Sequence, residues 1–176
     1  MISNELRKMR RDFYTEVVLC DLDGTLADTT HRHSLAPTAT NGSTWSAYAK
    51  ACTGDIPNFD LLQLLDVLSR RYLVHLISGR DGSALRETKE WLFAYDVPYD
   101  SVTLRPEDDE TYNADLKVRY IRQLREKGLK PFILFDDWKP TIEAVRREGV
   151  FVVEVKIPDA PLEPSGEAGY VGLESV

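Results

Sequence analysis

The stretch Val17-Val18-Leu19-Cys20-Asp21-Leu22-Asp23-Gly24-Thr25 contains the change of pattern that decides the fold. Four apolar residues come first, and a continuous apolar run of this kind is typical of a strand buried on both faces of a sheet. Two aspartates follow, separated by one residue, and then a glycine that allows the backbone to turn tightly. We therefore predict a buried strand that delivers two carboxylates to one edge of a parallel sheet.

Four more apolar runs follow the first, with helical patterns between them. The runs cover residues 72–77, 101–104, 131–135 and 150–155, and the helical patterns cover residues 59–70, 81–95, 115–127 and 140–147. Alternation of strands and helices indicates a parallel sheet with helices on both faces. The sequence thus predicts an α/β fold with a doubly wound, mainly parallel five-stranded sheet.

The length of 176 residues corresponds to a single domain. We expect this domain to cover residues 1–156 and to carry one small cap insertion, residues 26–58, after the first strand. Residues 157–176 are rich in Pro and Gly and are expected to form an irregular tail.

The predicted cap insertion contains the polar and aromatic residues whose role is least clear from the sequence. His31 and His33 lack the spacing of metal ligands, so we expect them to be exposed or, at most, to contact a substrate. Trp45 and Tyr48 can be interpreted in two ways. They form a small apolar centre of the insertion, or they form a platform on which a base stacks. The first interpretation is favoured.

The composition indicates an acidic globular protein. Lys and Arg number 22 and Asp and Glu number 29, so the formal net charge is −7. An acidic surface argues against sequence-independent coating of nucleic acid, although it leaves room for a small basic pocket that binds one phosphate. No stretch approaches the ~20 apolar residues of a membrane helix, and the N-terminus does not resemble a signal peptide. We expect a cytoplasmic protein without a membrane partner.

Polar residues at the ends of the predicted strands are the candidate functional residues. In an open parallel sheet, ligands bind outside the carboxyl ends of the strands. Seven such residues follow the first four apolar runs: Asp21, Asp23, Ser78, Arg80, Arg105, Asp136 and Asp137. We expect these side chains to converge at one edge of the sheet.

In their order along the chain, these residues resemble the four motifs of the haloacid dehalogenase superfamily of aspartate-nucleophile phosphatases. The matches are Asp21-Leu22-Asp23-Gly24-Thr25, Ser78 in Ile77-Ser78-Gly79-Arg80, then Lys117, then Asp136-Asp137. The sequence is more narrowly similar to the 3′-phosphatase domain of polynucleotide kinase/phosphatase enzymes. That similarity also includes Trp91-Leu92, Leu104-Arg105, Asp109, Asp115 and residues 145–150.

The resemblance implies a Mg²⁺-dependent phosphomonoesterase. Asp21 is expected to be the nucleophile that forms an aspartyl-phosphate, and Asp23 the general acid and base. Lys117 is expected to stabilise charge on the nucleophile and on the transferring phosphoryl group. Because Mg²⁺ prefers hard oxygen ligands, the expected metal ligands are Asp21, the main-chain carbonyl of Asp23, Asp136 and Asp137. Among these carboxylates, we expect Asp23 to hold a proton most readily.

Six further residues are expected to bind the phosphate or the rest of the substrate. The Ser78 hydroxyl and the Gly79 amide are suited to bind phosphoryl oxygens, and arginines are the natural partners of phosphates. The predicted set is Thr25, Arg32, Ser78, Gly79, Arg80 and Arg105.

A small cap leaves the cleft open to a long substrate, which favours a 3′-phosphate at a DNA or RNA end. Two alternatives stay open. One is a 5′- or 3′-nucleotidase that acts on nucleoside monophosphates, and the other is a weakly catalytic module that binds phosphorylated nucleic-acid ends. A separate kinase or ligase is an open possibility as a partner.

Overall fold

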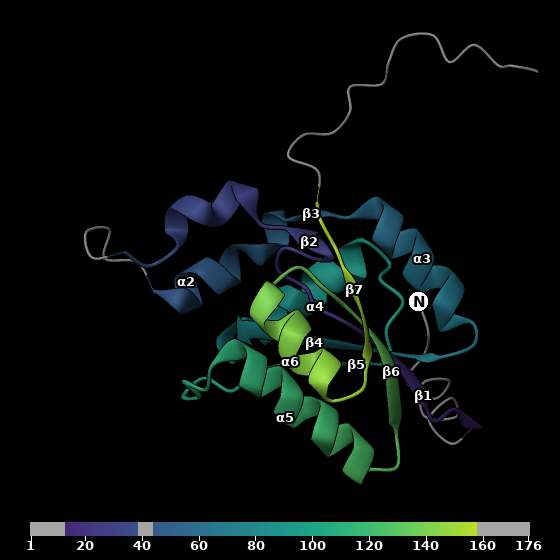
Figure 1. Cartoon of the computed structure of the whole chain (residues 1–176). Coiled ribbons are helices and arrows are strands. Elements are labelled where there is room, and N and C mark those ends of the chain that lie inside the picture. The colour runs from purple at the N-terminus through teal and green to yellow at the C-terminus, as the bar shows by residue number, and fades with distance from the viewer. Residues whose placement is uncertain (1–12, 39–43, 158–176) are drawn as a thin grey trace, which may run out of the picture.

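The computed structural model describes residues 13–38 and 44–157, and the centre of this part is a sheet between two layers of helices (Figure 1). The described residues form five strands in this sheet, in the order β5-β4-β1-β6-β7. Every neighbouring pair is parallel, which confirms the predicted doubly wound α/β fold. The strands are β1 (Glu16–Cys20), β4 (Leu73–Asp81), β5 (Ser101–Arg105), β6 (Lys130–Asp136) and β7 (Phe151–Glu154).

Helices cover both faces of the sheet. α5 (Asn113–Glu126) and α6 (Lys139–Arg147) lie side by side on one face, as Figure 1 shows. The opposite face packs against α3 (Phe59–Ser69) and α4 (Leu85–Ala94). The four predicted helices therefore form, and the ends of each lie within a few residues of the predicted ones.

The central strand contributes to both apolar cores. Val17 and Leu19 pack in the core below α5 and α6, whereas Val18 and Cys20 pack in the core below α3 and α4. All four side chains are buried. A strand in this position needs apolar residues on both faces, which explains the uninterrupted run in the sequence.

The position of β1 also determines where a ligand can bind. The chain passes from β1 to β4 and β5 on one side, and later to β6 and β7 on the other. In such sheets the ligand crevice lies at the carboxyl ends of the strands where the order reverses. The residues that follow β1, β4 and β6 are therefore brought together.

The second strand is longer than the sequence predicts. The predicted strand ends at residue 77, but β4 continues to Asp81 after an irregularity in its pairing with β5. Ile77 pairs with Thr103 and Asp81 with Arg105, so residues 78–80 lie opposite one residue of β5. This bulge carries the predicted phosphate-binding segment, and bulges are common next to active sites.

The predicted insertion lies between β1 and α3 and contains short elements. A two-stranded antiparallel pair, β2 (Ala27–Asp28) and β3 (Ile56–Pro57), joins its two ends. Between them are the 3₁₀ turns η1 (Thr30–Leu35) and η2 (Ala51–Gly54), and the helix α2 (Trp45–Lys50). The predicted tail lies outside the described residues, apart from Ile157. Among the described helices, none has the length and apolar character needed to cross a membrane.

Candidate active site

Three carboxylates and one lysine meet at the carboxyl edge of the sheet. One oxygen each of Asp21, Asp136 and Asp137 lies within 4.8 Å of the others. The Lys117 side chain, from α5, is fully buried. Its Nζ lies 2.8 Å from Asp21 Oδ2 and 2.6 Å from Asp136 Oδ2. The sequence predicted this cluster, and its four side chains carry a net charge of −2 when all are ionised.

Burial and mutual repulsion act on the titration of this cluster. Burial, opposed by Lys117, raises the pKa of Asp21 to about 6. Burial also raises the pKa of Asp136 above the ordinary value. The pKa of Asp137 is raised by the partial burial of its carboxylate and by repulsion from Asp21. Burial alone would lower the pKa of Lys117, but Asp21 and Asp136 outweigh it and hold the pKa well above the usual range. The lysine is therefore charged, but its single positive charge does not balance the three carboxylates.

The residues present fit a divalent cation. Asp21 Oδ1 is buried and has no hydrogen-bond partner among the described residues. An unsatisfied buried carboxylate oxygen is costly, and it is a ligand of the kind that Mg²⁺ prefers. Asp137 is exposed, and its Oδ1 accepts a 2.8 Å hydrogen bond from Thr25 Oγ1. Asp21, Asp136 and Asp137 are thus the side chains that could hold the metal.

Gly24 allows the loop after β1 to pass close to this cluster. Its φ is +82°, a conformation that favours glycine. A Cβ at this position would lie 2.9 Å from Cγ of Asp137, so a larger residue would displace that carboxylate. Thr25, predicted to bind substrate, is instead fully buried and orients Asp137 from the same loop.

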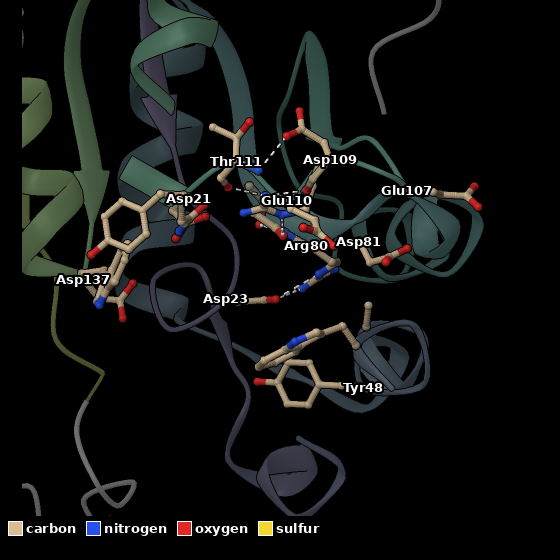
Figure 2. A pocket seen from close by; sticks show the side chains of 18 residues that line it. Asp21, Asp23, Tyr48, Arg80, Asp81, Glu107, Asp109, Glu110, Thr111 and Asp137 are labelled. Carbon is tan, nitrogen blue, oxygen red and sulfur yellow. Dashed lines mark hydrogen bonds and ion pairs between the residues drawn. The ribbon is translucent and has the colours of Figure 1, made fainter. Parts of the chain in front are cut away.

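The Asp23 side chain belongs to a second, separate charge cluster. Its Oδ1 accepts hydrogen bonds from Arg32 Nη2 at 2.7 Å and Arg80 Nε at 3.1 Å, and it also contacts Arg80 Nη2. Figure 2 shows Asp23 and Arg80 joined in this way, apart from Asp21 and Asp137. Burial alone would raise the pKa of Asp23, but the two arginines hold it below its usual value.

The prediction that Asp23 holds a proton most readily is therefore wrong for the charges in this structure. The carboxyl with a raised pKa is Asp21, since Lys117 offsets its burial only in part. Asp23 has two guanidinium partners instead. Nothing in the sequence pattern indicated that both arginines would reach this one carboxylate.

Two of the three predicted phosphate-binding arginines form ion pairs with aspartates in this structure. Arg32 is fully buried and bonds to Asp23, Asp55 and the Tyr48 carbonyl, which corrects its prediction as a substrate contact. Arg80 borders the cleft but bonds to Asp23 and to Thr88 Oγ1.

Arg105 supports the loop between β5 and α5. Its Nε donates to the Gly79 carbonyl at 3.1 Å, and its Nη1 donates to the carbonyls of Asp109 and Thr111. Arg105 also lines the cleft, so its contact with a substrate stays a prediction.

The nucleophile candidate opens onto a cleft of about 820 Å³. Ser78 and Gly79, from the bulge in β4, line this cleft as the sequence predicted. Asn113 also lines it and was missed; its Oδ1 is buried without a hydrogen-bond partner among the described residues. It precedes Lys117 by one helical turn, and this i, i+4 spacing was the available signal.

Two pairs of aromatic rings border the same cleft. The Trp45 and Tyr48 rings, from α2, are 5.6 Å apart, and the Tyr112 and Trp138 rings are 5.2 Å apart. Trp45 is 62% exposed and Tyr112 is 55% exposed. The interpretation of Trp45 as part of an apolar centre is therefore wrong, because this large ring lies at the surface of the cleft.

Both histidines of the insertion are exposed, as predicted. His31 Nε2 lies 2.9 Å from Asp55 Oδ1, and His33 Nε2 lies 3.0 Å from Thr29 Oγ1. His31 thus contacts a fully buried carboxylate that the sequence analysis did not single out.

We predict that Gly24→Ala weakens binding of Mg²⁺ by at least tenfold, because its Cβ displaces Asp137. Calorimetric titration with Mg²⁺ measures this. Gly128→Ala is the matched control, since Gly128 has a φ of +79° but open space around its Cβ. Both variants strain the backbone, so equal Mg²⁺ affinity in the two would contradict this role of Gly24.

Mg²⁺ affinity should also depend on pH. A cation competes with the proton on Asp21, whose pKa is raised to about 6. Because a raised carboxyl pKa favours the protonated form, affinity should be constant well above pH 6 and fall about tenfold per pH unit below it. Titrations between pH 5 and 8 test this, and an affinity that is flat across this range would contradict it.

Comparison with known proteins agrees with this geometry. Residues 15–159 match the model of the family described as the polynucleotide kinase PNKP phosphatase domain. Comparison with curated proteins finds no significant match.

Solved structures show the same fold. The chain resembles one from a Pnkp1/Rnl/Hen1 complex, with a TM-score of 0.67, 23% identity, and coverage of 81% of this chain and 46% of that one. The chain thus spans less than half the length of that protein. A class C acid phosphatase from Bacillus anthracis with bound tungstate gives a TM-score of 0.56 and 13% identity, covering 88% and 75%.

A third solved structure shares this fold. It is a haloacid dehalogenase family enzyme from Bacteroides thetaiotaomicron in complex with magnesium and inorganic phosphate. Its TM-score is 0.50 at 11% identity, with coverage of 82% of this chain and 96% of that one. Together with the family match over most of its length, the fold and the aspartate–lysine cluster show that this chain belongs to the polynucleotide kinase/phosphatase-type phosphatase domains of the haloacid dehalogenase superfamily.

Proposed function

We propose that the protein is a Mg²⁺-dependent phosphomonoesterase that removes 3′-phosphates from polynucleotide ends through an aspartyl-phosphate. The observation that carries the proposal is the cluster of Asp21, Asp136, Asp137 and Lys117, of which Asp21 and Asp137 line the cleft. The family match supports a phosphatase, and the architecture of the cleft supports the polynucleotide end as substrate.

Asp21 has the surroundings of a nucleophile. Oδ2 is held by Lys117, while Oδ1 has no hydrogen-bond partner among the described residues. In the first step a bond forms between an Asp21 oxygen and phosphorus, and the ester bond breaks. In the second step water attacks the phosphorus and regenerates Asp21. Mg²⁺, when bound, supplies positive charge that offsets repulsion between the carboxylates and the phosphate.

Other residues of the cleft act on the phosphoryl group and on the proton. Ser78 and the Gly79 amide are the candidates that bind phosphoryl oxygens, since both residues line the cleft at the bulge of β4. The Asn113 side chain lies beside Gly79. Asp23, in its protonated form, is the candidate that gives a proton to the leaving oxygen and later takes one from water, although Arg32 and Arg80 make this the minor form in the ligand-free protein. Its contacts with Arg32 and Arg80 hold the carboxylate in one orientation.

The cleft favours recognition of the end of a nucleic acid over tracking along its backbone. Exposed aromatic rings can stack on a base, and such stacking contributes about 1–3 kcal/mol per base. The rim of the cleft is acidic and includes Asp81, Glu107 and Glu110 (Figure 2). Acidic side chains repel the phosphates of adjoining nucleotides, so affinity should come from the scissile phosphate and the terminal nucleoside.

The same acidic rim favours a second candidate, a nucleotidase acting on nucleoside monophosphates. Such a substrate carries no further phosphates to be repelled, and its base can use the same rings. The substrate panel described below separates the two.

We also propose a separate partner that acts on the same nucleic-acid ends, such as a kinase or a ligase. The support is that matched structures include a Pnkp1/Rnl/Hen1 RNA repair complex, in which the matched chain is about twice as long as the aligned part. A cytoplasmic location stays a prediction.

The proposal predicts the substrate range and the effect of one substitution. The protein should release phosphate from a 3′-phosphorylated oligonucleotide in Mg²⁺, but not after chelation, and Asp21→Asn should lower kcat at least 10³-fold. A panel with 5′-phosphorylated oligonucleotides and nucleoside monophosphates measures this by phosphate release. Turnover of monophosphates alone would replace the polynucleotide proposal with the nucleotidase.

Stacking is tested with Trp45→Ala. Loss of the ring should raise KM for a 3′-phosphorylated oligonucleotide about tenfold, because a stacked base contributes 1 kcal/mol or more, and should change kcat little. Phe93→Ala is the matched control, since this ring is 65% exposed on α4 and lies outside the cleft. The same rise with an oligonucleotide whose 3′-terminal nucleotide is abasic would exclude stacking on the terminal base.

A further inference from the structure

A buried carboxylate of the cap insertion lies behind the Asp23 cluster. Asp55, directly before β3, is fully buried, and its side chain meets both arginines that hold Asp23. Arg32 Nε lies 2.7 Å from Asp55 Oδ1, and Arg32 Nη2 lies 2.8 Å from Asp55 Oδ2. This bidentate pair fixes the plane of the guanidinium group.

The second arginine is shared in the same way. Arg80 Nη2 lies 3.3 Å from Asp55 Oδ2, and Arg80 also bonds to Asp23. The two arginines and the two aspartates have no net charge when ionised. Each guanidinium group is therefore held between two carboxylates, with Asp23 on the cleft side and Asp55 on the buried side.

Asp55 is itself held firmly in place. Trp91 Nε1, from α4, donates a 2.8 Å hydrogen bond to the Asp55 carbonyl, and the Asp55 amide bonds to the Cys52 carbonyl. The Trp91 ring is buried in the apolar core. The position of Asp55 thus depends both on the cap insertion and on the core of the fold.

We propose that Asp55 is a positioning residue for catalysis, which acts through Arg32 and Arg80 to aim the Asp23 carboxylate at the leaving oxygen. This inference rests on the proposed phosphatase function and adds a residue to it. Removal of Asp55 leaves both guanidinium groups without their buried partner, so they can turn and take Asp23 with them. The cap then contributes to chemistry as well as to the shape of the cleft.

The step that depends on this geometry is proton transfer to the leaving group. As the bond from Asp21 to phosphorus forms, the ester bond breaks and its electron pair goes to the leaving oxygen. That oxygen takes a proton from the protonated form of Asp23, a minor form in the ligand-free protein that is populated from solvent before this step. Asp23 regains the proton in the second step, from the attacking water. An alkoxide needs this proton, whereas p-nitrophenolate is stable enough to leave without it. Turnover of the oligonucleotide therefore depends on the orientation of Asp23, whereas turnover of p-nitrophenyl phosphate depends on it much less.

The test compares kcat/KM of Asp55→Asn on a 3′-phosphorylated oligonucleotide and on p-nitrophenyl phosphate. We expect the value for the oligonucleotide to fall at least tenfold more than the value for p-nitrophenyl phosphate. A variant that is partly unfolded loses the same factor on both substrates, so the ratio is independent of the folded fraction. Equal losses on both substrates would overturn the proposal.

A double-mutant cycle with Asp23→Asn tests whether Asp55 acts through Asp23. Asp55→Asn should lower oligonucleotide turnover much less in the Asp23→Asn background than in the wild-type protein, and additive losses would contradict the proposal. Asp100→Asn is the matched control, because this buried aspartate accepts from the Val74 amide near the opposite edge of the sheet. It should leave the substrate ratio unchanged.

If Asp55→Asn does not fold, Asp55→Ser provides the same comparison with a smaller side chain that leaves space for water. If the wild-type protein does not cleave the oligonucleotide, the polynucleotide proposal is wrong. The ratio is then measured with an alkyl phosphate that the protein does hydrolyse, and the role of Asp55 is decided separately.

Discussion

Repulsion among three carboxylates is the constraint on which the rest of the site depends. At an effective dielectric constant of about 20, two charges separated by 4.8 Å repel by roughly 3.5 kcal/mol. Asp21, Asp136 and Asp137 nevertheless lie within that distance, because the fold fixes the position of each. Asp21 directly follows β1, and Asp136 is the last residue of β6, the adjacent parallel strand. Lys117 contacts both carboxylates, and Thr25 holds Asp137.

The carboxylates of this site are divided between two environments with different partners. Asp21 and its neighbours share one lysine, so their cluster keeps negative charge that a divalent cation can neutralise. Asp23 lies two residues along the chain, yet its side chain has two arginines. The turn at Gly24 follows directly, and the loop then passes beside Asp137. One short segment thus places the proposed nucleophile and the proposed proton carrier in surroundings of opposite charge.

The sequence predicted the sheet and the carboxylate cluster because both depend on local patterns. Buried parallel strands need apolar residues on both faces, and their carboxyl ends meet at one edge, so Asp21, Asp136 and Asp137 could be placed together. The contacts that the arginines make with Asp23 do not follow from local patterns. Arg32 lies 48 residues before Arg80, and only the folding of the insertion back onto β4 shows that they share Asp23.

The cap insertion has more influence on the site than its size suggests. On the cleft side, α2 presents the exposed Trp45 ring, and Ser46 contacts Ser83 in the turn after β4. On the buried side, Asp55 reaches both arginines, and its carbonyl accepts a hydrogen bond from a tryptophan in the core. A shift of the insertion would therefore change both the side of the cleft that Trp45 lines and the orientation of Asp23. In the proposed mechanism, substrate choice and proton transfer are therefore coupled through this one segment, while the carboxylate cluster is built by the strands and α5.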